Sequence, residues 1–351
     1  MTSVVSLTAP RTIVVEELPD APLGAGQVRI ETLYSGISAG TELTAYRGTN
    51  PYLHKRWDAA RRLFEAGEAP SLAYPVRSLG YEEVGRVVER APGVEAPAVG
   101  DLVYGTWNHR SQHVADAAWA AARVLPAGLD PRCGIFSHIG AVAVNGVHDA
   151  AIRSGDTVAV FGLGVPGQIV AQLARRSGAR VIGVDPIAGR RDLAQALGTA
   201  QLTLDPRADG VAEAMKDLTG GRGADVAIEV SGVAAALNEA IRAVAYSARV
   251  VAMGFMPGEA RGLQLGDEFH HNRVQVVSSQ ISGVDPAASY RWDKPRLAAT
   301  TIALQAEGIL DLLPLISHTF DLADAAAAFA LLDQRPEEAL QVVLRMPGAE
   351  A

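Results

Sequence analysis

Three glycines near the middle of the chain have the spacing of a phosphate-binding turn. Gly162, Gly164 and Gly167, in the segment FGLGVPG, follow the apolar run TVAVF and open the helical pattern VPGQIVAQLARRSG. The first glycine permits a tight turn, the second lets the backbone approach a pyrophosphate, and the third lets helix and strand pack closely. The helix N-terminus adds N–H donors and the positive end of its dipole. This context predicts a dinucleotide-binding site, and the alternative is a glycine-rich turn with a structural role only.

An acidic residue, Asp185, stands where such a site needs a partner for the ribose hydroxyls, directly after the next apolar run, RVIGV. A carboxylate there accepts hydrogen bonds from the adenosine ribose and repels a 2′-phosphate, so Asp185 favours NAD(H) over NADP(H). Arg190 and Arg191 follow closely and leave NADP(H) open, because an arginine at this place binds a 2′-phosphate. The predicted cofactor-binding residues are Gly162, Gly164, Val165, Pro166, Gly167, Asp185, Arg190, Ser231 and Gly254.

The elements that position these residues change in character along the chain. The first 140 residues hold short β-type runs between Gly and Pro, such as QVRIETLYSG and GDLVYGTW, which indicate an all-β barrel or sandwich. From Asp156 onward, apolar runs alternate with helical patterns, which indicates βαβ units and a buried parallel sheet. Two helical patterns (296–308 and 322–332) and the strand-like ALQVVLRM follow. We therefore predict an α/β protein with a β-rich domain and a doubly wound nucleotide domain.

The overall composition argues against several kinds of partner. A net charge of −8 and a pI near 5.5 disfavour a surface for nucleic acid or anionic membranes. The single cysteine, Cys133, excludes an intrachain disulfide and a four-cysteine zinc loop. The N-terminal segment lacks the long apolar core of a signal peptide, and no apolar run is long enough to span a bilayer. We expect a cytoplasmic protein with a small-molecule substrate and no nucleic-acid or membrane partner.

Five stretches of the sequence together resemble the medium-chain dehydrogenase/reductase superfamily. They are YSGISAGTEL (34–43), LGYEEVGRVVE (79–89), VGDLVYG (99–105), FGLGVPG (161–167) and PLISHTFDLADAAAAFALL (314–332). The resemblance implies a GroES-like β-rich catalytic domain from residues 1–140 and 284–351, and a Rossmann dinucleotide-binding domain from 141–283. It also implies hydride transfer with a nicotinamide cofactor, and a homodimer formed through the edge strand within HHNRVQVVSSQ.

The sequence departs from this family where the metal-dependent members hold zinc. In those members the resemblance implies Cys at the position of Ser38, His at that of Tyr81, and Cys or Glu near His138. Neutral serine and tyrosine oxygens are poor zinc ligands beside thiolate and imidazole. The segments GISAGTE, LGYEEVG and NHRSQH are similar to a zinc-independent branch that includes bacteriochlorophyllide-type dehydrogenases and quinone-reductase-like members. We therefore predict that the protein uses no zinc.

Without zinc, the proton that accompanies hydride transfer needs a protein side chain. The predicted catalytic residues are Ser38, Thr41, Tyr81, Glu82 and His138, and the resemblance places all of these except Glu82 around one pocket. Tyr81 is the first candidate for the acid/base or oxyanion donor, and His138 is the second because the pKa of an imidazole suits proton exchange near neutrality. Thr41 matches a proton-relaying Ser/Thr of the zinc enzymes, and Glu82 stabilises the site. The alternatives are a space-filling tyrosine and a buried, hydrogen-bonded histidine.

These residues predict a zinc-independent, NAD(P)-dependent oxidoreductase that acts on a secondary alcohol or ketone of a small molecule, such as a specialised metabolite. An NADPH-dependent enone or quinone reductase is the alternative, and a non-catalytic nucleotide-binding partner protein is a lesser one. The segment 46–74 is longer than in a compact member of the family. Its stretch YLHKRWDAARRLFEAG predicts an added helix that covers the substrate cleft.

Overall fold

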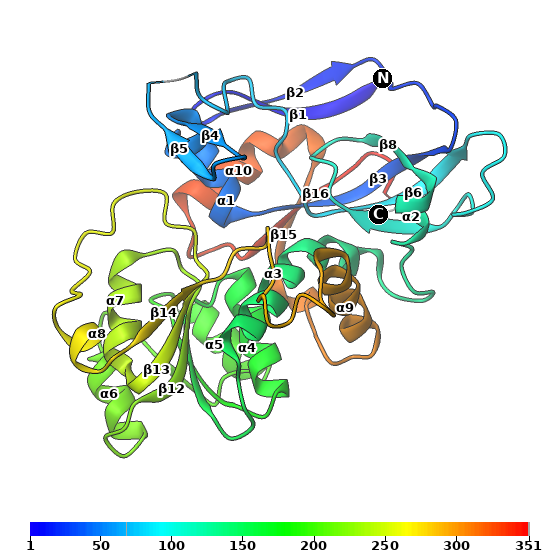
Figure 1. Ribbon diagram of the computed structural model, residues 1–351. Coiled ribbons are helices and arrows are strands. Elements are labelled where there is room, and N and C mark those ends of the chain that lie inside the picture. The colour runs from blue at the N-terminus through cyan, green and yellow to red at the C-terminus, as the bar shows by residue number, and fades with distance from the viewer. Residues whose placement is uncertain (68, 350–351) are drawn as a thin grey trace. The chain divides into compact units, whose positions relative to one another are not determined.

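The computed structural model describes residues 1–67 and 69–349 of the chain (Figure 1). The chain divides into two units, Met1–His138 with Leu313–Ala351, and Ile139–Leu312. The sequence analysis placed residues 284–312 in the catalytic domain, whereas this stretch groups with the second unit here. No helix in the described ranges combines the length and apolar character needed to cross a membrane.

A six-stranded sheet forms the centre of the first unit. Its long strand β3 pairs antiparallel with β6 along one edge, and with β8 and then β16 along the other, while β7 and β15 extend the sheet outward. The strands are β3 (Gln27–Ile37), β6 (Glu83–Arg90), β7 (Leu102–Gly105), β8 (Gln112–Asp116), β15 (Ile316–Asp321) and β16 (Gln341–Arg345). A separate antiparallel pair comprises β1 (Thr2–Ala9) and β2 (Thr12–Leu18). This arrangement confirms the predicted β-rich domain.

Short helices and one long helix accompany these strands. They are α1 (Ala39–Tyr46), η1 (Pro51–Leu53), α2 (Ala117–Ala121), η2 (Pro131–Ile135), η3 (Leu313–Leu315), η4 (Leu322–Asp324) and α10 (Ala325–Gln334). The apolar side of α10 packs with α1, β1 and β16 in one core, in which Phe329 is fully buried and its ring lies 5.6 Å from that of Tyr46. The helix α1 therefore has a fixed support, and its N-terminus follows directly after β3.

Residues 52–67, all of which the structure describes, do not form the predicted helix. They form a hairpin of β4 (Arg56–Asp58) and β5 (Leu63–Glu65). The Asp58 carboxylate accepts the N–H groups of Ala60 and Arg61, which turns the chain at the point where a helix would have continued. The Trp57 and Phe64 rings then pack 4.8 Å apart across the hairpin. The local side-chain turn and the aromatic pair outweigh the helical spacing of the apolar residues.

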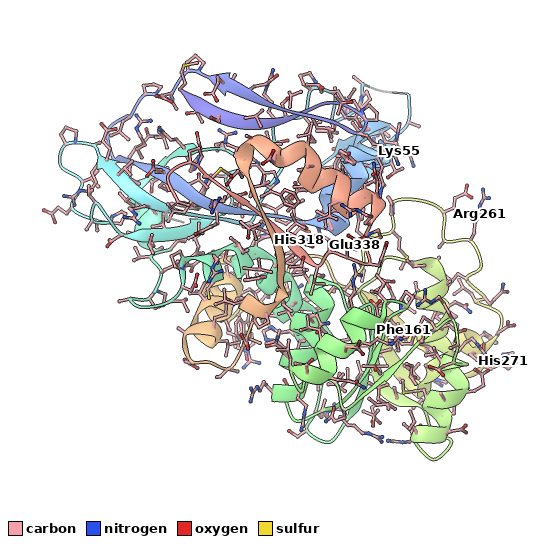
Figure 2. The ribbon with its side chains drawn as sticks, turned by 180° about the vertical axis from the view of Figure 1, so that it is seen from behind. Lys55, Phe161, Arg261, His271, His318 and Glu338 are labelled. Carbon is pink, nitrogen blue, oxygen red and sulfur yellow. The ribbon has the colours of Figure 1, made fainter. Side chains whose placement is uncertain are left out.

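The second unit is built on six parallel strands in the order β11-β10-β9-β12-β13-β14 (Figure 1). The first of these in the sequence, β9, lies in the middle, so the chain builds one half of the sheet and then returns to build the other. The strands are β9 (Thr157–Phe161), β10 (Arg180–Val184), β11 (Leu202–Leu204), β12 (Ala224–Glu229), β13 (Val244–Ala252) and β14 (Gln275–Ser278). Every residue of β9 is buried, up to Phe161 at its carboxyl end (Figure 2). This confirms the predicted doubly wound Rossmann sheet.

Helices connect the strands of this sheet and supply much of its covering. They are α3 (Phe136–Ala150), which begins in the first unit, and α4 (Val165–Arg176), α5 (Ala188–Ala196), α6 (Val211–Leu218), α7 (Ala234–Ala243), α8 (Glu268–His271) and α9 (Lys294–Ala306). The apolar faces of α6 and α7 join the strands in one core around the fully buried Met215. Because the strands are parallel, their carboxyl ends lie along the same edge of the sheet.

Candidate active site and nucleotide-binding turn

The glycine-rich turn lies where the chain passes from β9 into α4. Gly162 has a φ of 94°, and a Cβ on it would lie 2.9 Å from the Cβ of Ser231. A Cβ on Gly167 would lie 1.9 Å from the carbonyl oxygen of Gly162, so this glycine lets the helix touch the end of the strand. A Cβ on Gly164 would meet only the Arg190 guanidinium, at 3.9 Å, so this glycine leaves space before the helix N-terminus. The three glycines thus form the cradle that a pyrophosphate requires.

Asp185 follows β10 and has a fixed orientation. One carboxylate oxygen accepts the N–H of Leu163 and the other accepts the N–H of Ile187, both at 2.8 Å. Arg190 places a guanidinium nitrogen 3.9 Å from the same carboxylate, and Arg191 donates to the Asp185 carbonyl oxygen at 2.7 Å. The carboxylate therefore stands beside the glycine turn, as a ribose-binding aspartate does, with one arginine close to it.

The ends of β12 and β13 bring together the remaining predicted cofactor residues. Glu229, the fully buried last residue of β12, accepts the N–H groups of Ser231 at 2.7 Å and Gly232 at 3.0 Å. Its own carbonyl oxygen accepts the N–H of Gly254. Burial raises the pKa of the Glu229 carboxyl. The sequence analysis missed Glu229, although an acidic residue at the end of the apolar run ADVAIE was a signal for it.

In the first unit, the side chains of Tyr81 and Ser38 meet. The Tyr81 hydroxyl donates a hydrogen bond of 2.5 Å to Ser38 Oγ. Ser38 is the N-cap residue of α1, and its side chain makes no capping hydrogen bond to that helix. The backbone N–H of Ser38 donates to Glu42 Oε1 at 2.8 Å. Burial raises the pKa of Tyr81, with added contributions from Glu82 and Glu42. The phenol therefore stays protonated at neutral pH and acts as a hydrogen-bond donor.

His138 and Thr41 lie beside this pair. The His138 ring, in the first turn of α3, stands edge-on to the Tyr81 ring with centroids 4.7 Å apart. Thr41 is exposed in the first turn of α1, and hydrogen bonding with Ser38 and Thr41 opposes the increase in the pKa of Tyr81. The structure thus brings together four of the five predicted catalytic residues around the Tyr81 hydroxyl and ring.

Glu82, the fifth predicted residue, is buried directly after Tyr81. Among the described residues, neither of its carboxylate oxygens has a hydrogen-bond partner. The Gln341 amide lies close enough to lower the pKa of Glu82, but it donates to two backbone carbonyls. Burial, followed by the charges of Glu42 and Glu83, raises the pKa of Glu82 well above its ordinary range. The surroundings of Glu82 therefore favour its neutral, protonated form over the carboxylate.

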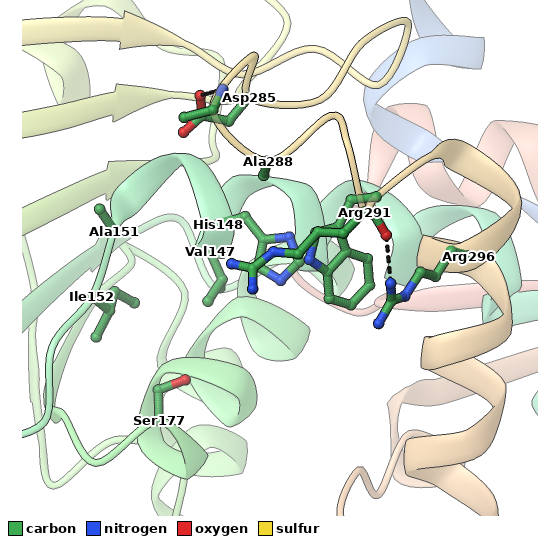
Figure 3. Close-up of a pocket in the computed structure, with 11 residues that line it drawn as sticks. Val147, His148, Ala151, Ile152, Ser177, Asp285, Ala288, Arg291 and Arg296 are labelled. Carbon is green, nitrogen blue, oxygen red and sulfur yellow. Dashed lines mark hydrogen bonds between the residues drawn. The ribbon is translucent and has the colours of Figure 1, made fainter.

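A pocket of about 450 Å³ in the second unit contains none of these candidates. It is lined in part by His148, Arg291 and Trp292, and the rings of His148 and Trp292 lie 4.5 Å apart (Figure 3). The glycine turn and Asp185 are not among its lining residues. This pocket is therefore separate from the nucleotide-binding turn.

Comparison with known proteins identifies the family. The family model for zinc-binding dehydrogenases matches residues 164–294. The D-guloside 3-dehydrogenase of Shigella flexneri is 34% identical over 342 residues, which cover 95% of this chain and 97% of that protein. The chain belongs to the medium-chain dehydrogenase/reductase superfamily. It is an NAD(P)-dependent dehydrogenase, so the prediction of an enzyme is confirmed.

Solved structures of this superfamily share the fold. A Sinorhizobium meliloti 1021 protein bound to NADP superposes with a TM-score of 0.76 at 24% identity, over 98% of this chain and 99% of that one. An Escherichia coli CFT073 alcohol dehydrogenase complexed with NADH gives a TM-score of 0.76 at 20% identity, with the same coverage. The cradle of glycines and the Asp185 carboxylate fit the nicotinamide dinucleotide that the superfamily binds.

The catalytic zinc of many superfamily members does not fit the residues at the corresponding place. Within residues 1–67 and 69–349, no group of three His, Cys, Asp or Glu side chains has an arrangement that holds a metal ion. The side chains at two of the three ligand positions, Ser38 and Tyr81, are neutral hydroxyls bonded to one another. The unpartnered Glu82 carboxyl would suit a cation, but its burial favours the protonated acid. As zinc ligands, these oxygens are weaker than the thiolate and imidazole that the resemblance implies for the metal-dependent members.

Proposed function

We propose that the protein is a zinc-independent, NAD(H)-preferring dehydrogenase that interconverts a secondary hydroxyl and a ketone on a polyhydroxylated small molecule. The observation that carries this proposal is the Tyr81–Ser38 hydrogen bond, at two positions where metal-dependent relatives hold zinc. A protonated phenol there gives the reacting oxygen a hydrogen-bond partner in place of a metal. The similarity to a dehydrogenase whose name gives a D-guloside as its substrate supports a sugar-like substrate.

The paired hydroxyls supply a route for the proton. NAD⁺ held at the glycine turn beside Asp185 would supply the hydride acceptor for the carbinol carbon. The Tyr81 oxygen takes the substrate's hydroxyl proton while the Tyr81 proton passes to one of its two hydrogen-bond partners, Ser38 Oγ or the exposed Thr41 hydroxyl, which releases its own proton to solvent. No phenolate forms, which matters because burial raises the pKa of Tyr81. In the reverse direction Tyr81 donates its proton to the ketone oxygen, and His138 lies at its ring edge as the second candidate for this transfer.

The preference for NAD(H) is supported by the position of Asp185. Two backbone N–H groups fix its carboxylate beside the glycine turn, so its negative charge faces the place of the adenosine ribose. Arg190, 3.9 Å away, is close enough to offset part of that charge. The preference is therefore a matter of degree.

The test is a Tyr81→Phe variant assayed with NAD⁺ and a panel of sugars, glycosides and polyols. Removing the hydroxyl lowers kcat by about 10²–10⁴-fold, the usual contribution of a positioned acid or base. Tyr74→Phe is the matched control, because the half-buried Tyr74 hydroxyl donates to the Ala45 carbonyl oxygen instead. Unchanged turnover of Tyr81→Phe contradicts the role of Tyr81.

Two further measurements separate this function from its alternatives. Metal analysis of protein purified without chelator is expected to give far less than one zinc per chain, and stoichiometric zinc that is needed for turnover contradicts a metal-free mechanism. Enones and quinones are assayed in parallel with NADPH. Turnover confined to these acceptors identifies a reductase instead of an alcohol dehydrogenase.

A further inference from the structure

A fully buried histidine, His109, lies behind the Tyr81–Ser38 pair in the first unit. Its Nε2 lies 2.8 Å from Glu42 Oε2, and its Nδ1 lies 2.7 Å from Ser35 Oγ. Ser35 Oγ in turn donates to Glu83 Oε1 at 2.9 Å, and Glu83 Oε2 accepts the Trp107 N–H at 2.7 Å. An imidazole thus bridges two buried carboxyl groups from different elements, one on α1 and one on β6.

The same carboxyl group connects His109 to Ser38. Glu42 Oε2 contacts His109 Nε2, and Glu42 Oε1 accepts the Ser38 N–H. The two oxygens of this carboxyl group therefore connect the N-terminus of α1 with the imidazole. Because the Ser38 side chain makes no bond to α1, its Oγ depends on this backbone contact for its position. A shift of Glu42 would therefore move the atom that accepts the Tyr81 hydrogen bond.

His109 also packs against the segment that precedes Tyr81. The backbone N–H of His109 donates to the Leu79 carbonyl oxygen at 2.8 Å, and the neighbouring Asn108 side chain donates to the Gly80 carbonyl oxygen at 3.0 Å. Gly80 has a φ of 93°, and a Cβ on it would lie 2.6 Å from His109 Nδ1. His109 therefore contacts the supports of both partners, Ser38 through Glu42 and Tyr81 through the backbone before it.

Ser35 has a single hydroxyl hydrogen, which it donates to Glu83, so its oxygen accepts Nδ1–H of His109. The Glu42 carboxylate is an acceptor at Nε2, so the two contacts together are best satisfied by a doubly protonated imidazole. Burial lowers the pKa of His109, but the Glu42 and Glu83 carboxyls outweigh it and raise that pKa overall.

We propose that the His109 side chain is a positioning group for hydride transfer, which holds Ser38 in place through Glu42 and the segment before Tyr81 in place through the packing of its ring on Gly80. It touches neither substrate nor cofactor. The role rests on the proposed function, because it matters only if the Tyr81 hydroxyl meets the reacting oxygen.

The test compares His109→Gln with His113→Gln. The side-chain amide of the His109→Gln variant would keep an N–H donor for Glu42 but lose the hydrogen bond to Ser35. The Tyr81–Ser38 pair would also lose the packing of a rigid ring behind it. A displacement of about 1 Å in a reacting group costs up to about 10²-fold, so we expect a 10–100-fold lower kcat. The KM values for substrate and cofactor stay within about threefold, and the primary deuterium isotope effect on kcat rises because hydride transfer becomes rate-limiting.

His113 is a suitable control because it is a half-buried histidine of the same segment, in β8. Its ring stacks on the Trp107 indole with centroids 5.5 Å apart, and burial lowers its pKa to about 4, so it is neutral in the working range. His113→Gln is expected to lower stability without changing kcat or the isotope effect by more than about twofold.

The outcomes distinguish this inference from the proposed function. If Tyr81→Phe is inactive while folded His109→Gln keeps wild-type kcat and isotope effect, the positioning role is refuted and the function stands. If Tyr81→Phe is fully active, the proposed function fails, and the positioning role fails with it. Should His109→Gln not fold, the isosteric Glu42→Gln variant carries the same test, since it weakens the contact to His109 and to the Ser38 N–H together. Wild-type kcat in Glu42→Gln refutes the inference.

Discussion

Two glycines of the nucleotide-binding turn have different tasks, and alanine substitutions separate them. A Cβ on Gly167 would lie 1.9 Å from the Gly162 carbonyl oxygen, far inside van der Waals contact, so helix α4 must move away from β9. Overpacking of this kind costs about 1–3 kcal/mol. In a domain of about 150–250 residues, each kcal/mol lowers Tm by roughly 2–4 °C, so Gly167→Ala lowers the Tm of the unliganded protein by about 2–12 °C.

Gly164→Ala is expected to behave in the opposite way. Its Cβ would have the Arg190 guanidinium at 3.9 Å as its neighbour, an ordinary contact, and its φ of −65° suits alanine. The Tm of the unliganded protein therefore stays within about 1 °C, while the methyl group occupies the approach of the pyrophosphate. We therefore expect NADH binding to weaken by about 1.4 kcal/mol or more, which corresponds to a Kd for NADH at least about tenfold higher.

The assay is differential scanning fluorimetry without cofactor, combined with titration of NADH by fluorescence. Gly266→Ala, at a position with nothing within 4 Å of the added Cβ, is the control for both measurements. If Gly164→Ala binds NADH as tightly as the wild type, the space before α4 is not the pyrophosphate site. If Gly167→Ala has an unchanged Tm, the close approach of helix and strand does not constrain the turn.

Three more predictions follow from the charges and the sheet edge. Asp185→Asn removes the charge but keeps the size of the side chain. The ratio of kcat/KM with NADPH to kcat/KM with NADH is expected to rise by about 10–100-fold, which corresponds to the free energy of one charge-assisted hydrogen bond. An unchanged ratio contradicts the role of Asp185. Burial raises the pKa of Glu83 to about 7, so folded protein binds this proton more tightly than unfolded protein, and the free energy of unfolding falls as pH rises from about 4.3 to about 7. Denaturant titrations of Glu83→Gln should show a flatter dependence across that window, and equal slopes contradict the assignment. Among the described strands, β14 pairs only with β13, and Val276 on β14 is 40% exposed, so this strand is an edge available for pairing. Light scattering is expected to show a homodimer, and Val276→Lys is expected to weaken it.

The sequence was most informative where a backbone requirement fixes the residue type. Gly162 needs a positive φ and Gly167 admits no Cβ, so the turn between β9 and α4 was recognisable from the glycine spacing together with the apolar run before it and the helical pattern after it. The alternation of apolar runs and helical patterns likewise predicted the parallel sheet, because strands buried on both faces have few polar residues. Asp185 could be placed for the same reason, since it ends the run that becomes β10.

The sequence was less informative where the structure depends on contacts between distant residues. The segment 46–74 had helical spacing, but the turn at Asp58 and the packing of Trp57 on Phe64 make it a hairpin. His109 received no role, because nothing in NHRSQHV shows that this histidine is enclosed by carboxyl groups from α1 and β6. Pairing of β3 with β6 and β8 brings these groups together, and such pairing is not encoded in any one segment.

The replacement of two ligand positions in this chain has a physical logic, because the two new side chains satisfy one another. A tyrosine at position 81 beside a thiolate would leave a buried phenol next to a charge, and a serine at position 38 beside an imidazole would leave a weak metal site. Together, Tyr81 and Ser38 form one short hydrogen bond. Burial raises the pKa of the neighbouring Glu82, and His109 lies between Glu42 and the Ser35–Glu83 pair. In the proposed metal-free mechanism, these contacts hold the protonated Tyr81 hydroxyl where it can exchange a hydrogen bond with the reacting oxygen.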